Sequence, residues 1–165
     1  MSDRPVIFLA FANDQEDRSK YLRGLAAELR GIRQALLPAR QAGAVEVIER
    51  ANATLADILD VFQDPDYAGR IRIFHYGGHA ESYQLLLESD QNSVQVAHAE
   101  GFNAFLANQS GLQVVFLNGC SSRSQALDLR AAGIPAVIGT SRAIQDDIAT
   151  RFAVRFYKGL AGYAT

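Results

Sequence analysis

Short apolar runs alternate along the chain with longer segments in which apolar residues recur every three or four positions. The short runs are rich in β-branched and aromatic residues, which is typical of buried parallel strands. The longer segments have the period of amphipathic helices. The predicted strands are residues 5–11, 44–48, 71–75, 113–117 and 135–139. This alternation predicts an α/β fold with a mostly parallel central sheet of about five to six strands, flanked by helices.

Helices are predicted between and after these strands, and the first of them runs to Pro38. The residues expected on buried helix faces are Leu22, Leu25, Ala26, Leu29, Ile32 and Leu36 in the first helix, Leu55, Ile58, Leu59 and Phe62 in the second, Phe102, Phe105 and Leu106 in the third, Ala126, Leu127 and Leu129 in the fourth, and Ile148, Phe152, Phe156 and Leu160 in the last. The expected N-caps are Asn13 or Asp14, Asn52, Ser121 or Ser122, and Asp146. Residues 85–87 and 94–96 flank a polar segment and predict a small hairpin.

Two of the predicted strands end in glycine followed by a reactive side chain. One leads through Gly77 and Gly78 to His79, and the other leads through Gly119 to Cys120. Open α/β sheets carry their chemistry just beyond the carboxyl ends of the strands. If these two strands are neighbours, a thiol and an imidazole emerge at the same edge of the sheet, as a nucleophile with its base.

Each reactive residue also has an ordinary structural interpretation. A single cysteine is more often a buried small hydrophobe than a nucleophile, although Cys120 lies between a strand end and a helix start, where a thiolate is favoured. His75, at the end of a strand, is interpreted as a packed histidine, but either His75 or His79 could pair with the thiol. The glycine pair before His79 favours His79, and His98 is interpreted as a surface residue.

Other kinds of site find less support. The Gly77–Gly78 pair lacks the spacing of a phosphate-binding loop, and Ser121 and Ser122 lack the G-x-S-x-G pattern of a serine hydrolase. The three histidines are dispersed without metal-ligand spacing, so no metal or cofactor is expected. Asp146 could line a substrate pocket, together with Asp147 or with His75, although helix capping explains Asp146 without a ligand.

Composition and charge narrow the classes of partner. The 165 residues fit one domain, and a net charge of -2 offers no electrostatic argument for binding nucleic acid or an anionic membrane. No apolar run approaches the roughly 20 residues of a membrane helix. The single cysteine excludes an internal disulfide, and a cytoplasmic location is expected. Because the sequence stops soon after its last helix, we expect a domain from the N-terminal part of a longer multidomain protein.

Three stretches of the sequence resemble the CHAT domain, a prokaryotic branch of the caspase-like cysteine peptidases, which also include caspases, metacaspases and separase. The stretches are residues 73–80, 114–122 and 133–140, the last of them continued by 144–146 and 152–157, and they occur in the family's order. The resemblance implies a single domain over residues 1–165, folded as a three-layer caspase-like sandwich with a small hairpin.

The resemblance also implies the roles of individual residues. It places the catalytic histidine on His79, the nucleophile on Cys120, and the oxyanion hole on the backbone N–H groups of Cys120 and Ala80. Gly78, Asn118 and Gly119 adjoin these positions and are expected to support the site.

The function implied is that of a cysteine endopeptidase with a Cys-His dyad that cleaves a protein or peptide substrate. Such domains act beside sensor or repeat domains, in the same chain or complex, as regulated effectors of bacterial defence or signalling. One alternative is a catalytically inactive interaction module with the same core. Another is a TIR-like NAD-cleaving domain, which residues 8–14 faintly resemble, although no glutamate marks such a site.

Overall fold

A computed structural model of the chain describes residues 3–13, 24–78, 80–81, 84–88, 94–119, 122–140 and 146–162. For residues 80–81, 84–88, 94–99 and 146 it describes the backbone alone. Five parallel strands form the central sheet in the order β2-β1-β3-β7-β8. Their bounds are Val6–Phe11 for β1, Glu46–Ala51 for β2, Ile71–Gly77 for β3, Val114–Asn118 for β7 and Ala136–Ile138 for β8.

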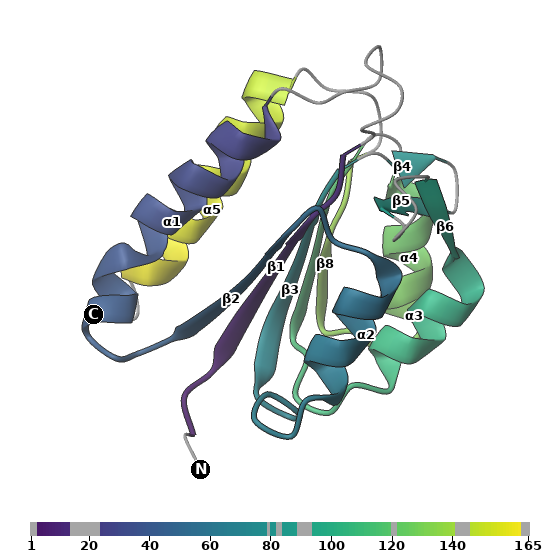
Figure 1. Cartoon of the computed structure of the whole chain (residues 1–165), viewed down its shortest axis with the longest axis horizontal. Helices are drawn as coiled ribbons and strands as arrows, with labels where there is room; N and C mark the ends of the chain where they lie inside the picture. Colours follow the sequence, from purple (N-terminus) through teal and green to yellow (C-terminus); the bar gives the residue numbers. More distant parts are fainter. Residues whose placement is uncertain are drawn as a thin grey trace.

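Helices cover both faces of this sheet and complete a three-layer architecture (Figure 1). On one face lie α1 (Leu25–Gln41) and α5 (Asp146–Gly162), side by side. On the other lie α2 (Leu55–Gln63), α3 (Ala99–Ala107) and α4 (Arg123–Ala131). The predicted α/β class, the parallel sheet and the flanking helices are therefore confirmed.

The predicted hairpin is part of a second, smaller antiparallel sheet. Strand β5 (Gln84–Glu88) pairs with β6 (Val94–His98), and the two-residue strand β4 (Ala80–Glu81) pairs with the other side of β5. The hairpin is confirmed, with one strand more than expected. Strand β4 begins three residues after β3 ends, so this small sheet starts beside the carboxyl end of β3.

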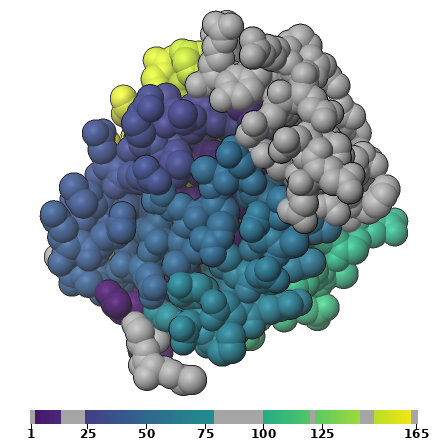
Figure 2. Space-filling model, viewed as in Figure 1, coloured from purple at the N-terminus to yellow at the C-terminus, as the bar shows by residue number. Residues whose placement is uncertain are grey.

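Strand β1 shows why the central strands are almost wholly apolar. All six of its residues are buried, and little of β1 is visible in Figure 2. Because successive side chains of a strand point to opposite faces, Phe8 belongs to the core under α2, α3 and α4, whereas Ile7 and Leu9 belong to the core under α1 and α5. A strand covered on both faces has no need of polar positions.

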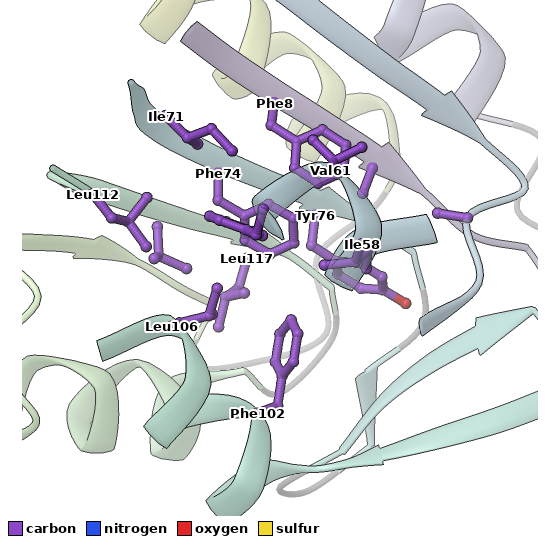
Figure 3. Close-up of a cluster of buried hydrophobic side chains, with 14 of the residues drawn as sticks. Phe8, Ile58, Val61, Ile71, Phe74, Tyr76, Phe102, Leu106, Leu112 and Leu117 are labelled. Atoms are coloured by element: carbon purple, nitrogen blue, oxygen red, sulfur yellow. The ribbon is translucent and has the colours of Figure 1, made fainter. Parts of the chain in front are cut away.

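Aromatic rings dominate the core beneath α2 and α3. Phe8, Phe62 and Phe74 lie with ring centroids 5.4 to 5.8 Å apart, and Phe102 continues the group at 6.1 Å from Phe74. Figure 3 shows Phe8, Phe74 and Phe102 together with Tyr76 in this cluster. Edge-on and tilted pairs of this kind add to the stabilisation that burial of their area provides.

Two local predictions about helix ends are wrong. Helix α1 continues through Pro38 to Gln41, with Leu36 and Ala39 buried on either side of the proline, so tertiary packing holds this last turn although proline removes one backbone hydrogen bond. Asn52 does not cap α2. It has a left-handed φ of 58°, and Thr54 forms a capping box with Asp57 instead.

The last helix turns a partly different face to the core than predicted. Ala153, Tyr157 and Ala161 are buried, whereas Ile148, Phe152 and Leu160 are 45%, 52% and 36% exposed. Phe156, the fourth predicted residue, does pack against the core. Gly31 of α1 lets the two helices approach closely, because a β-carbon on it would lie 2.5 Å from Val154 of α5. The buried face of α4 also differs from the predicted one. Leu129 is buried as expected, but Leu127 is exposed and Gln125 is buried instead.

Candidate active site

The ends of strands β3 and β7 lie next to one another, which is the condition that the proposed pairing of thiol and imidazole requires. Gly77 is the register partner of Asn118, and the N–H of Gly78 donates a hydrogen bond to the carbonyl oxygen of Asn118 at 3.3 Å. His79 follows Gly78 in the sequence and Cys120 follows Gly119, but both candidate catalytic residues lie outside the described residues. The structure thus describes the framework that leads to them.

Close packing explains the glycine pair at the end of β3. A β-carbon on Gly77 would lie 2.5 Å from the ring of Phe11. One on Gly78 would lie 2.5 Å from the hydroxyl of Tyr76 and 2.7 Å from the carbonyl oxygen of Ala12. The N–H of Ala12 also donates to the carbonyl of Gly77 at 3.0 Å, so the end of β3 is held tightly against β1.

A hydroxyl pair holds the end of β7 on its other side. The hydroxyl of Ser122 donates to the carbonyl of Leu117 at 3.2 Å and accepts the N–H of Thr140 at 2.9 Å. The hydroxyl of Thr140 in turn donates to the carbonyl of Gly119. Ser122 occupies the predicted N-cap position of α4 but makes no capping bond, because its hydroxyl is hydrogen-bonded to Leu117 and Thr140 instead. Sequence reasoning did not assign a role to Thr140.

A buried polar cluster connects helix α1 to both strand ends. Oε1 of Glu28 lies 3.0 Å from Nε2 of His75 and accepts a hydrogen bond from Nδ2 of Asn118 at 2.7 Å. The three residues are 3%, 0% and 8% exposed. Sequence reasoning missed Glu28. The available signal was its position on the apolar side of α1, three residues after Leu25 and four before Ile32.

Aromatic rings surround His75. Its ring centroid lies 4.6 Å from that of Phe116, 5.5 Å from Phe11 and 5.7 Å from Tyr157. Among the described residues, neither Nδ1 of His75 nor the hydroxyl of Tyr157 has a hydrogen-bond partner. Burial, and secondarily the nearby carboxyl of Glu28, raise the pKa of Tyr157 well above its ordinary value.

The model of the CHAT domain family matches residues 1–165 of the sequence. The chain belongs to the CHAT family. A search of curated proteins found no match. Among solved structures, this CHAT domain is similar to a secreted C11 cysteine protease from Bacteroides thetaiotaomicron, solved in complex with an irreversible peptide inhibitor. The TM-score is 0.58 and the identity 11%, over 87% of this chain and 50% of the protease chain.

Two other structural matches have a TM-score of 0.46 and an identity of 11% each. The Drosophila initiator caspase Dronc is matched over 71% of this chain and 49% of its own, and an NAD(P)H:quinone oxidoreductase from Methanothermobacter marburgensis over 95% and 97%. The CHAT domain therefore spans about half the length of the C11 protease and of the caspase. At this identity, the likeness to the C11 protease shows a common caspase-like fold.

The other residues predicted for the site of the CHAT domain lie on β3, β4 and α5. His75 is fully buried, which fits the packed histidine of the sequence interpretation and leaves it no surface for lining an open substrate pocket. Asp146 is the first residue of α5, with its side chain outside the described residues. Asp147 is exposed and contacts Arg151 at 3.0 Å. The backbone of Ala80 begins β4, opposite Leu85.

The described residues contain neither a candidate metal site nor a candidate membrane span. No group of three histidine, cysteine or acidic side chains within the described ranges could hold a metal ion. None of the helices in those ranges is long and apolar enough to span a bilayer.

Proposed function

We propose that this CHAT domain is a cysteine endopeptidase in which Cys120 is the nucleophile and His79 the general acid and base. One observation carries the proposal: β3 and β7 are parallel neighbours in register, with Gly77 opposite Asn118. The chain therefore leaves both strands at the same edge of the sheet, and Gly78 and Gly119 are the described residues that precede His79 and Cys120 in the sequence. Membership of the CHAT family, with a fold like that of a C11 cysteine protease, supports the same chemistry.

The mechanism needs two proton transfers and one covalent intermediate. The Cys120 thiolate attacks the scissile carbonyl carbon, and the backbone N–H groups of Cys120 and Ala80 stabilise the oxyanion that develops. Protonated His79 gives its proton to the leaving amine as the C–N bond breaks, which leaves a thioester. Neutral His79 then takes a proton from water, the hydroxide attacks the thioester, and the acid product leaves with the thiolate restored. No cofactor takes part.

The proposal also covers the substrate, the regulation and the cellular location of the domain. The substrate is a protein or peptide, in keeping with the peptide inhibitor bound to the similar C11 protease. A sensor or repeat domain, in the same chain or complex, regulates cleavage in a bacterial defence or signalling system. A cytoplasmic location belongs to the proposal, because a reducing compartment keeps the single thiol available.

The test compares the wild type with Cys120→Ala and His79→Ala on a diverse peptide library. We expect each variant to lose at least about 100-fold in kcat/KM, as removal of a nucleophile or a general base does. His98→Ala, which changes the third histidine, is the matched control and should cleave like the wild type. Equal cleavage by all four proteins would exclude the dyad.

Alkylation of the thiol provides a second readout that needs no substrate. Cys120 is the chain's only cysteine, so the rate of alkylation against pH reports on it alone. A dyad lowers the midpoint pH in the wild type relative to His79→Ala. A wild-type midpoint near the ordinary value of about 8.5, unchanged in His79→Ala, would instead identify an inactive interaction module.

A further inference from the structure

We infer that Glu28 is a positioning residue of this active site, which ties helix α1 to the strand ends that lead to His79 and Cys120. The inference rests on the proposed function. Glu28 acts through His75 and Asn118, which it contacts directly, and its effect is on where the two strand ends lie.

A single carboxyl oxygen bridges the two neighbouring strands. Oε1 of Glu28 contacts Nε2 of His75 in β3 and Nδ2 of Asn118 in β7, at 3.0 and 2.7 Å. His75 stands two residues before Gly77, the last residue of β3, and Asn118 is the last residue of β7. The helix is therefore bonded to both strands within two residues of their carboxyl ends.

The position of Glu28 in the helix argues for a role beyond folding. Its neighbours on the inner face of α1, Ile32 and Leu36, are buried apolar residues, and a carboxyl with 3% exposure is costly to bury even when it is hydrogen-bonded. An apolar residue at position 28 would complete this face at a lower cost in desolvation. The carboxyl lies instead where it fixes the separation between helix and strand ends.

Short connections carry this constraint towards the reactive residues. Only Gly119 separates Asn118 from Cys120, and the carbonyl of Gly119 is held from the other side by the hydroxyl of Thr140. Loss of the Glu28 carboxyl would leave the amide of Asn118 and Nε2 of His75 without this partner and free to find others. A displacement of about 1 Å at a reacting group can cost on the order of 100-fold in rate.

The experiment uses Glu28→Met, which keeps the side-chain length and removes the acceptor, and Glu28→Gln, which keeps an acceptor oxygen. Ile32→Val is the matched control, because it changes a buried residue one turn along the same face of α1. For each protein the thermal midpoint, kcat and KM on a cleaved library peptide, and the pH profile of Cys120 alkylation are measured.

We expect Glu28→Met to lower kcat by about tenfold or more with little change in KM, and to move the midpoint pH of alkylation. Glu28→Gln should recover most of both. Ile32→Val should lower the thermal midpoint and leave kcat and alkylation at wild-type values. If Glu28→Met does not fold, Glu28→Asp withdraws the carboxyl by one methylene and takes its place with the same expectations.

Failure of the inference and failure of the proposed function give different results. A Glu28→Met protein that matches Ile32→Val in kcat and alkylation would show that the carboxyl is merely structural, and would overturn the inference. If Cys120→Ala cleaves as well as the wild type, the proposed function fails. The pH profile of alkylation then still shows whether Glu28 positions the strand end that leads to Cys120, because it reports the surroundings of the thiol without any substrate.

Discussion

At the end of β3, two neighbouring glycines stand where other strands would carry side chains. The contacts that surround Gly78 differ in kind from those of an ordinary turn glycine, because one of them is the backbone carbonyl of Ala12. A flexible side chain can move aside for an added methyl group. The backbone of Ala12 cannot, because its N–H is hydrogen-bonded to the carbonyl of Gly77, and any movement would displace the end of β3.

Gly78→Ala should therefore disturb both folding and activity. Its β-carbon would lie 2.5 Å from the Tyr76 hydroxyl and 2.7 Å from the Ala12 carbonyl oxygen. We expect a loss of about 1–3 kcal/mol in the free energy of unfolding, typical of overpacking, and a lower kcat/KM on peptides. Denaturant unfolding and library cleavage measure the two effects.

The control is Gly101→Ala in α3, where an added β-carbon meets no atom within 4 Å. Because alanine is the better helix former, the free energy of unfolding of this variant should rise by roughly 0.5–1 kcal/mol, and its peptide cleavage should match the wild type. Similar losses in both variants would mean that the packing at Gly78 is not what makes that position sensitive.

Features that depend on local sequence were predictable. The ends of β3 and β7 shortly before His79 and Cys120, and the packed state of His75, follow from short motifs, whereas the catalytic roles of His79 and Cys120 stay predictions. Glu28 and Thr140 were missed because their contacts cross 90 and 21 residues of sequence, to Asn118 and Gly119. A glutamate in a helix usually faces water, and periodicity alone does not reveal when a strand end offers it a donor.

At the scale of elements, helix α2 shows how a start is chosen between competing residues. Both Asn52 and Thr54 are good N-cap residues, but only Thr54 has an acidic residue three positions later to complete the box. The N–H of Asp57 donates to the Thr54 hydroxyl at 3.0 Å, and the Asp57 carboxylate accepts the N–H of Thr54 at 2.9 Å.

Thr54→Ala should remove one of these two bonds and weaken the other. We expect it to lower the free energy of unfolding by about 1 kcal/mol, the usual cost of a lost N-cap. Asn52→Gly is the matched variant: glycine readily adopts the φ of 58° seen there, so stability should not fall. Thermal unfolding compares them, and the reverse order of midpoints would restore Asn52 as the cap.

The face of α5 could not be predicted from periodicity. Residues 148, 152, 156 and 160 repeat every four positions, and so do the buried residues 153, 157 and 161. The larger apolar residues favoured the first series. The second series faces inward nevertheless, with Tyr157 fully buried between the small residues Ala153 and Ala161, and Phe152 is left half exposed.

For the whole molecule, the parallel sheet and its covering layers were predictable because they follow general rules of α/β folds, whereas the order of the strands was not predicted. Parallel strands joined through helices must have both faces covered, and short connections keep successive units adjacent. The third strand of the small sheet was not predicted, because β4 has only two residues and carries no periodic signal.

The pH dependence of unfolding is a property of the whole molecule that one side chain should influence. Burial raises the pKa of Tyr157 above 10, so above that pH the unfolded chain releases a proton that the native protein keeps. The unfolded state then binds fewer protons, and the free energy of unfolding contributed by Tyr157 falls as pH rises. Below pH 10 this contribution is fully present.

Tyr157→Phe should remove this alkaline loss and also the buried hydroxyl, which has no partner among the described residues. At pH 7 we expect the variant to be as stable as the wild type or more stable by about 1 kcal/mol. The difference should widen above pH 10. Urea unfolding from pH 7 to 11 measures it, and a variant that is less stable throughout would indicate a missing partner for the hydroxyl.

The bond between Glu28 and Asn118 also bears on when the domain becomes competent during synthesis. It closes a loop of 90 residues, and contacts so distant in sequence form only after the intervening chain has been ordered. A nascent chain that has emerged only as far as β3 has neither Asn118 nor Cys120, the proposed nucleophile that follows it. Most of the domain must therefore leave the ribosome before this helix–strand bond can form, and an unfinished polypeptide cannot contain the complete proposed site.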